Sequence, residues 1–320
     1  VDLRRTGVGS RFQYRGFAHP DADGQGCQPL RQALSGASRL NETNFPIRAF
    51  RLFRLSLLVV SGALVALGIF PLCSDAARLR LKASWSAALL DTLGIKVEAD
   101  LTHVVPGALL VANHISWIDI YVINAVLPAA FVSKEEVRRW PLIGWLAAKN
   151  DTVFLRRGSR GHARIINGQV AALLACGKHV AVFPEGTTTD GQALLHFHAA
   201  LIQPALAAGR PVLPVGISYW EPNGQRSLAP RYDGEISLGQ CTRAILGRKR
   251  LIARLVTTPL RGLNGEDRRL VAAEAREAIA LAAGLPLASN RPGTPVDLPD
   301  AMPSGELPTG SRNPAQADLA

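Results

Sequence analysis

A histidine and an aspartate five residues apart are the first candidates for chemistry in this chain. His114 and Asp119 lie in the segment NHISWID, which directly follows the apolar run ALLVA. Five steps along a regular helix turn about 140° beyond a full circle, so the two side chains would not share a helix face. They can meet if His114 lies in a strand-to-helix turn and the helix begins near Ser116. Asp119 would then fix the tautomer of the imidazole and leave its other nitrogen free as a general base.

The same residues also allow a purely structural interpretation. Ser116-x-x-Asp119 matches a capping box, in which the carboxylate only satisfies the backbone at the start of a helix. A single histidine at the end of a strand is also compatible with a structural role. On spacing alone, both interpretations stay open.

Two further polar segments follow apolar runs. FPEGTTTDG, residues 183–191, offers backbone and hydroxyl donors for an anion, although an ordinary polar turn would have the same composition. FLRRG, residues 154–158, carries Arg156 and Arg157, whose guanidinium groups can bind phosphate or can lie on a solvated rim. Three polar segments at successive strand ends favour a functional site more strongly than any one of them does.

The elements that must position these segments are short apolar runs alternating with helical stretches. The predicted helices are Ala163–Cys176, Ala199–Ala208 and Glu266–Ala283. The predicted strands are ALLVA (108–112), AAFV (129–132), TVFL (152–155), HVAVF (179–183) and PVLPVGI (211–217). This alternation predicts an α/β domain with a largely parallel sheet flanked by helices. Sites in such sheets collect at the carboxyl ends of the strands, where the three polar segments begin.

An uncharged run precedes this domain. LSLLVVSGALVALGIFPLCS, between Arg54 and Asp75, has the length that crosses a bilayer core. Three cations flank it on each side, so the positive-inside rule gives no orientation. A helix dipping into one leaflet, with a second amphipathic helix near Ala76–Leu93 along the surface, fits the pattern, and so does a single crossing. We therefore expect an N-terminal membrane helix or helix pair.

The overall charge indicates an anionic partner. The 320 residues carry a formal net charge of +11, with 48% hydrophobic residues and a mean hydropathy of +0.12. An anionic membrane surface and nucleic acid both fit this charge. The acid-free stretch from Arg243 to Arg261 could bind nucleic acid, but it lacks a recognised motif and follows a hydrophobic segment. We favour the membrane and expect no nucleic-acid partner.

Taken together, the motifs resemble the glycerolipid acyltransferases, the family of 1-acylglycerol-3-phosphate acyltransferase. NHISWID is similar to the N-H-x4-D block of that family, and FLRR, FPEGT and Val212-Leu213-Pro214-Val215 are similar to its second, third and fourth blocks. Ser133-Lys134 followed by WPLIG resembles its K…P-x-x-G stretch. The blocks occur in the order of the family, within a resemblance that covers roughly residues 50 to 250.

The resemblance implies a catalytic pair and an acceptor site. His114 would be the general base and Asp119 its partner. Lys134, Arg156, Arg157 and the Glu185-Gly186-Thr187 turn would bind the substrate. The family needs no metal and no cofactor, and its acyl donor is a thioester on CoA or on acyl carrier protein. No covalent acyl-enzyme is expected, because G-x-S-x-G is absent.

Two positions depart from the pattern of the family and both concern the acceptor. Arg156 occupies a position that is often acidic or an amide, and Thr188 follows E-G-T where many phosphate-binding members have arginine. If Arg156 points into the pocket, it replaces the missing charge; if it points to solvent, a zwitterionic head group fits better. We favour the interpretation in which Arg156 replaces the missing charge. If the strand continued through Arg156 and Arg157, their side chains would point to opposite faces of the sheet.

The resulting prediction is a membrane-associated acyltransferase whose catalytic domain faces the cytoplasm. The simplest reaction is acylation of 1-acylglycerol 3-phosphate to phosphatidate, and the alternative acceptors are lyso-ornithine lipid and other lysophospholipids. A lipid hydrolase using the same pair, and a basic binding protein without catalysis, are rivals from other classes. The predicted organisation is a disordered extension (1–44), anchoring helices (45–95), the catalytic domain (96–285) and a flexible proline-rich tail (286–320).

Overall fold

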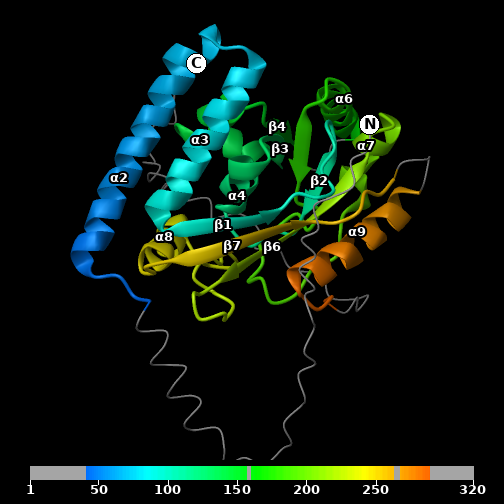
Figure 1. Ribbon diagram of the computed structural model, residues 1–320. Coiled ribbons are helices and arrows are strands. Elements are labelled where there is room, and N and C mark those ends of the chain that lie inside the picture. The colour runs from blue at the N-terminus through cyan, green and yellow to red at the C-terminus, as the bar shows by residue number, and fades with distance from the viewer. Residues whose placement is uncertain (1–40, 157–159, 263–266, 289–320) are drawn as a thin grey trace, which may run out of the picture.

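A seven-stranded sheet forms the centre of the molecule (Figure 1). The computed structural model describes residues 41–156, 160–262 and 267–288. The strand order is β1-β7-β6-β2-β5-β3-β4, and all neighbouring pairs are parallel except β6 and β7, which are antiparallel. The strands are β1 (Ile95–Asp100), β2 (Leu109–Ala112), β3 (Ala129–Lys134), β4 (Val153–Leu155), β5 (His179–Val182), β6 (Val212–Trp220) and β7 (Leu251–Thr257). The predicted largely parallel α/β sheet is confirmed.

The apolar runs predict five of these strands and miss β1 and β7. β1 alternates apolar residues with Lys96, Glu98 and Asp100, and β7 is interrupted at its centre by Arg254, which lies opposite Glu98. These charged residues break the continuous apolar run by which the other strands are recognised. The structure also extends the predicted strand 211–217 to Trp220.

Helices cover both faces of the sheet. The three predicted helices correspond to α6 (Arg160–Ala175), α7 (Gln203–Ala207) and α9 (Arg268–Ala283). The second of them is shorter than predicted, because Ala199–Leu201 forms a 3₁₀ turn before α7. The remaining helices of the domain are α4 (Asp119–Val126), α5 (Ile143–Lys149) and α8 (Leu238–Leu246). They have only seven to nine residues each, too few for an apolar period to be visible in the sequence.

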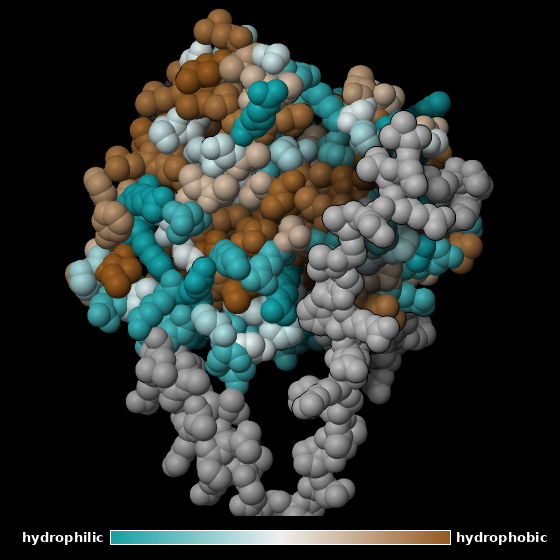
Figure 2. All heavy atoms as spheres, in the orientation of Figure 1, coloured by the Kyte–Doolittle hydropathy of each residue, from teal (hydrophilic) through white to brown (hydrophobic). Residues whose placement is uncertain are grey.

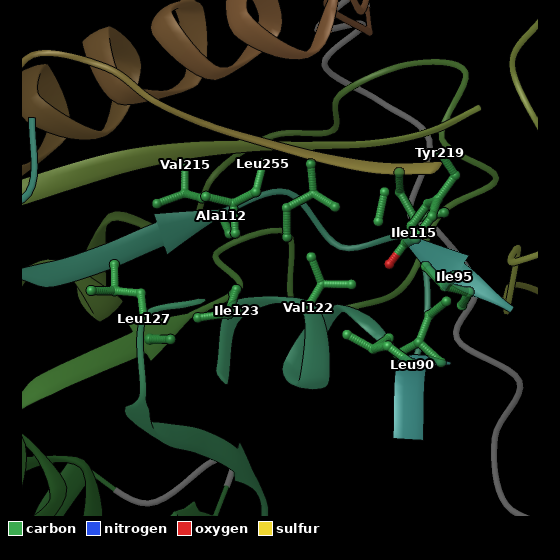
Figure 3. Close-up of a cluster of buried hydrophobic side chains, with 14 of the residues drawn as sticks. Leu90, Ile95, Ala112, Ile115, Val122, Ile123, Leu127, Val215, Tyr219 and Leu255 are labelled. Carbon is green, nitrogen blue, oxygen red and sulfur yellow. The ribbon is translucent and has the colours of Figure 1, made fainter. Parts of the chain in front are cut away.

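Two hydrophobic cores lie on opposite faces of the sheet. The first joins the sheet to α3, α4 and α8, and Figure 3 shows its central part, where Val122 and Ile123 face Val215 and Leu255, and Leu90 lies near Ile95. The second core joins the sheet to α6, α7 and α9. β2 is buried on both faces, so the turn that follows it starts from a rigid strand.

An N-terminal helical hairpin lies on the α4 side of the sheet (Figure 1). α2 (Phe45–Leu64) continues through a π-helical turn (Val65–Ile69) and a 3₁₀ turn (Phe70–Leu72), and α3 (Asp75–Leu93) returns to the domain. Phe45–Leu72 is long and apolar enough to cross a membrane, and 11% of its most apolar window is buried. Figure 2 shows hydrophobic side chains gathered over this hairpin. The expected N-terminal apolar helix is thus present, and it suggests membrane association.

Both ends of the hairpin are attached to the catalytic domain. Thr43 is buried and donates from Oγ1 to Leu246 O at 2.6 Å. Arg51 donates to the carbonyls of Arg248 and Lys249, at 2.6 and 2.7 Å. At the other end, the last turns of α3 belong to the first core, with Leu93 fully buried.

These contacts modify two features of the predicted organisation. The segment 41–44, predicted as part of a disordered extension, is attached to the domain, and residues 1–40 lie outside the described residues. α3 packs on α4 and β1, so it is not simply an amphipathic helix lying along a membrane. At the other terminus, Leu194 N–H donates to Pro286 O, and the tail beyond Ala288 lies outside the described residues.

Candidate active site

The active-site turn, residues 113–118, connects β2 to α4 at the carboxyl edge of the sheet. Asn113 fixes its first residue to β6, because its side chain donates to Ile217 O at 3.0 Å and accepts from Ile217 N–H at 2.7 Å. Glu185 holds the next residue by accepting from His114 N–H at 2.8 Å. The start of the turn is therefore fastened to β6 through Asn113 and to Glu185 through the backbone of His114.

The structure brings His114 and Asp119 together as the sequence predicts. Nδ1 of His114 lies 2.9 Å from Oδ2 of Asp119, whose side chain is fully buried. The same oxygen accepts from the N–H groups of Ile115 and Ser116, at 2.7 and 2.8 Å. The carboxylate thus orders the whole turn as well as the imidazole, and it fixes Nδ1 as the protonated nitrogen.

Half of the capping-box pattern is present, because Asp119 Oδ2 accepts from Ser116 N–H at 2.8 Å, but the same oxygen also contacts His114 and the Ser116 hydroxyl does not return the bond. α4 begins at Asp119 itself, and its N-cap residue, Ile118, makes no side-chain capping bond. Asp119 N–H donates to the carbonyl of Ser116, while Ser116 Oγ lies 3.8 Å from Cys241 Sγ. The Ser116 hydroxyl therefore does not cap the helix.

The imidazole is stacked on one ring and remains partly exposed. The ring of His114 stacks on Phe183, with centroids 3.9 Å apart and planes within 10°. Its side chain keeps 19% of its surface exposed. Within the described part of the chain, no hydrogen bond engages Nε2. An imidazole held in one tautomer with an accessible Nε2 can accept a proton from a bound hydroxyl or water.

Tyr219 is a member of the site that the sequence analysis misses. Its hydroxyl donates to Oδ1 of Asp119 at 2.5 Å. Burial raises the pKa of Tyr219 well above its ordinary value, and the Asp119 charge raises it further, so this hydroxyl stays a donor. The only signal in the sequence is the position of Tyr219 two residues after the predicted strand 211–217, at a carboxyl end.

Glu185 supports the site from the protein interior. The side chain is buried, and its second oxygen accepts from Leu195 N–H at 3.0 Å. Burial raises the pKa of Glu185 to about 7, against the two backbone hydrogen bonds, which lower it. Both carboxylate oxygens of Glu185 thus accept from backbone N–H groups. Gly186, with a φ of 69°, then turns the chain toward Thr187, which is exposed. Substrate contact by this turn stays a prediction.

Glu185 should make the stability of the protein pH-dependent. Its pKa in the unfolded chain is near the ordinary 4.5, so between pH 4.5 and about 7 the folded chain holds a proton that the unfolded chain has lost. Folding stability from this group therefore falls as pH rises through that window, by up to about 3 kcal/mol. Glu185→Gln removes this component. Chemical denaturation from pH 5 to pH 8 measures the free energy of unfolding of both proteins. The difference in favour of wild type should shrink as pH rises, and a constant difference would contradict the raised pKa of Glu185.

The predicted cationic residues lie farther along the same edge. Lys134 ends β3 and Arg156 follows β4, and Lys134 pairs in register with Leu155. Both side chains are exposed, so Arg156 is not buried in a pocket. Arg157 lies outside the described residues. Contact of these cations with a substrate stays a prediction.

An apolar cavity of about 440 Å³ lies between the hairpin and the domain. Ile120 and Tyr121, the residues directly after Asp119, form part of its wall. The other walls come from α2, α3, β3 and α5, and include Leu58, Val65, Phe70, Trp85, Phe131, Ile143 and Leu146. Its wall residue Phe131 stacks on Phe183, which in turn stacks on His114, and a cavity of this kind can hold a hydrocarbon chain.

The basic stretch that suggested nucleic acid is partly paired within the protein. Arg254 forms an ion pair with Glu98, Arg248 with Glu221 and Arg261 with Glu274. Among the residues that the structure describes, no three His, Cys, Asp or Glu side chains are grouped to hold a metal ion.

Comparisons with known proteins agree on one family. The family model described as Acyltransferase matches residues 95–218. The chain is 40% identical over 205 residues to a lyso-ornithine lipid O-acyltransferase of Pseudomonas aeruginosa, covering 64% of this chain and 79% of that protein. It is 35% identical over 218 residues to a 1-acyl-sn-glycerol-3-phosphate acyltransferase of Neisseria meningitidis, covering 67% and 84%.

A solved structure has the same fold. PlsC, the 1-acyl-sn-glycerophosphate acyltransferase of Thermotoga maritima, superposes with a TM-score of 0.52 at 23% identity, covering 73% of this chain and 97% of that one. With the ordered motifs, the His114–Asp119 pair and the two relatives, this fold leads to one conclusion. The chain belongs to the acyltransferase family of the lyso-ornithine lipid and 1-acylglycerol-3-phosphate enzymes, and it is an acyltransferase that acts on lysolipids.

Proposed function

We propose that this enzyme transfers an acyl group from a thioester of CoA or acyl carrier protein to a lysolipid hydroxyl, with His114 as general base. The observation that carries the proposal is the fixed Nδ1–Asp119 contact, which leaves Nε2 of a partly exposed imidazole for the substrate. Nε2 takes the proton of the acceptor hydroxyl while its oxygen attacks the thioester carbonyl. The C–S bond then breaks, and the imidazolium returns the proton to the leaving thiolate. No residue of the protein is acylated.

Asp119 and Tyr219 have supporting roles in this reaction. The carboxylate keeps Nδ1 protonated and stabilises the imidazolium that forms when Nε2 takes the proton. Tyr219 donates to the opposite carboxylate oxygen and keeps it from rotating. The apolar cavity beside Ile120 supports the proposal, because it can bind the hydrocarbon chain of one substrate next to the base.

The structure changes which acceptor we favour. Thr188 takes the place of an arginine, and its hydroxyl donates to Tyr232 O. Arg156, which the sequence analysis favours as a replacement charge, is exposed. A pocket with fewer buried cations suits a zwitterionic acceptor better than a phosphomonoester with nearly two negative charges. We therefore propose lyso-ornithine lipid, the acceptor named for the relative in Pseudomonas aeruginosa, ahead of 1-acylglycerol 3-phosphate.

A product assay with a panel of acceptors tests this function. The full-length enzyme in mixed micelles receives one acyl thioester and, separately, lyso-ornithine lipid, lysophosphatidate and a zwitterionic lysophospholipid. We expect a diacylated product with the highest kcat/KM for lyso-ornithine lipid. A higher value for lysophosphatidate would overturn the acceptor assignment and leave the reaction type standing.

We further propose that the hairpin dips into one leaflet and does not cross the bilayer. The start of α2 is held by Thr43 and Arg51 against the α8–β7 turn, and the end of α3 lies in the domain core. Both ends are therefore on the side of the domain. A crossing by α2 would require α3 to cross back with Arg78, Arg80 and Lys82, which is costly in hydrocarbon. Cytoplasmic orientation follows if the thioester donor is cytoplasmic.

The exposed face of α2 should carry membrane binding. Leu57, Val60 and Leu64 are 54%, 57% and 64% exposed, and burying such side chains stabilises by roughly 1.5–3 kcal/mol each. Replacing all three with glutamine should weaken binding to anionic vesicles by more than about a hundredfold, measured by vesicle sedimentation. Deletion through Leu72 is a less specific test, because it also removes the contacts of Thr43 and Arg51.

A matched control comes from the opposite part of the molecule. Leu270 and Leu281 on α9 are 54% and 87% exposed, so their replacement with glutamine removes similar apolar surface. This control should bind vesicles as wild type does. Equal binding by both variants would show that the hairpin is not the anchor.

A further inference from the structure

The loop that follows β6 is fastened to the active-site turn. Tyr232 N–H donates to Ile115 O at 3.1 Å, and Thr188 Oγ1 donates to the carbonyl of Tyr232. The residues on either side of Tyr232 are Arg231 and Asp233. Their ion pair is bidentate, with Nε and Nη2 of the arginine 2.8 and 2.9 Å from the two carboxylate oxygens. Two charged side chains therefore flank a residue whose backbone is bonded to the active-site turn.

A third charge is attached to the same turn. Thr189 donates to His114 O from its N–H at 2.9 Å and from its hydroxyl at 3.2 Å, and Asp190 is the next residue. Asp190 lies near enough to Arg231 that, after Asp233, its charge also raises the pKa of the guanidinium. We call Asp190, Arg231 and Asp233 the charged ring. Its formal charge is −1, from two carboxylates and one guanidinium.

The carboxylate of Asp190 accepts from the N–H and the side-chain amide of Gln192, both at 2.9 Å, while the Arg231–Asp233 pair has little structural purpose of its own. Arg231 and Asp233 retain 38% and 22% of their side-chain surface, and partly exposed pairs of this kind contribute only about 0–1 kcal/mol to stability. A ligand that offers both a carboxylate and an ammonium can therefore open the pair and replace each contact with an equivalent one. A phosphate dianion cannot do so, because it would meet two carboxylates for one guanidinium.

We propose that the charged ring selects the acceptor by its head group. Arg231 binds the head-group carboxylate, and Asp190 and Asp233 bind the head-group ammonium. Lyso-ornithine lipid has both groups within a few bonds of the amide-linked 3-hydroxyacyl chain, whose hydroxyl reaches Nε2 of His114. The inference rests on the proposed function and adds the residues that distinguish a zwitterionic acceptor from an anionic one.

The test compares two acceptors across single variants of the full-length enzyme. Asp190→Asn, Asp233→Asn and Arg231→Gln are assayed for kcat/KM with lyso-ornithine lipid and with lysophosphatidate, using one thioester donor. Each aspartate variant should lower the ratio of lyso-ornithine to lysophosphatidate kcat/KM by about tenfold, mainly through KM, because each loses one charge-assisted contact. Arg231→Gln should lower lyso-ornithine kcat/KM by a similar factor. Unchanged thermal unfolding shows that the variants are folded.

Glu98→Gln is the matched control. Glu98 forms a comparably exposed ion pair with Arg254, on strands remote from β2 in the sheet order, and its removal should leave the acceptor ratio unchanged. The inference is overturned if the ring variants alter both acceptors equally, or if Glu98→Gln shifts the ratio as they do. It is also overturned, with lysolipid acylation still standing, if wild type acylates only lysophosphatidate. Absence of transfer to any lysolipid would overturn the proposed function itself.

Discussion

Replacing His114 with alanine is expected to lower the rate of acyl transfer by roughly 10²- to 10⁴-fold, the range for loss of a general base. The imidazole is partly exposed and its Nδ1 is held by Asp119 at 2.9 Å, so Nε2 is the nitrogen left for the substrate. The loss should appear in kcat, because the variant retains the apolar cavity and the charged ring. Steady-state kinetics with saturating lysolipid measure it.

A second histidine variant separates catalysis from general damage. His196 is exposed and distant in sequence from the active-site turn, so His196→Ala should keep normal turnover. Thermal unfolding should show both variants folded, since the His114 side chain accounts for only one of the hydrogen bonds to Asp119. Near-normal turnover in folded His114→Ala would contradict the role of the imidazole.

Asp119→Asn is expected to cost about 10- to 100-fold in kcat while the protein remains folded. The amide oxygen can take the place of Oδ2 and accept from the turn, with its NH₂ group facing the hydroxyl of Tyr219. The shape is kept, but the negative charge that stabilises the imidazolium is lost, and charge-assisted hydrogen bonds are worth about 1.5–3 kcal/mol. Asp119→Ala should instead destabilise the fold by several kcal/mol, because it leaves buried N–H groups of the turn without an acceptor.

Tyr219→Phe provides the control for this interpretation. Alone, it removes the hydroxyl that donates to Oδ1 and should reduce turnover modestly. Combined with Asp119→Asn it should add little, because both changes disrupt one contact. Additive losses in the double variant would mean that Tyr219 affects activity independently of Asp119.

The strands could be predicted where burial on both faces requires an uninterrupted run of apolar residues. Strands buried on both faces, such as β2 and β5, show as continuous apolar runs, and the alternation with helices predicts the parallel sheet. β1 and β7 escape this test because charged residues interrupt both of them, at alternate positions in β1 and at Arg254 in β7. The attachment of the hairpin was not predictable, since Arg51 binds carbonyls about 200 residues away and nothing local marks that pairing.

The contact between His114 and Asp119 was predictable from the sequence, and its surroundings were less so. The strand-to-helix turn explains how residues five apart can meet, and the structure has that turn. Tyr219 and Glu185 have contacts that cannot be inferred from the spacing of residues in the sequence. One reaches Asp119 from a strand 100 residues away, and the other directs its carboxylate inward to backbone N–H groups. Both roles depend on tertiary packing.

The most direct test of the account measures thioester consumption by purified enzyme with and without a lysolipid acceptor, and identifies the product. We predict that thiol release depends on the acceptor, that it matches formation of the acylated lipid mole for mole, and that both stop together in His114→Ala. Equal thiol release without acceptor, with free fatty acid as the product, would contradict acyl transfer and identify the His114–Asp119 pair as part of a hydrolase.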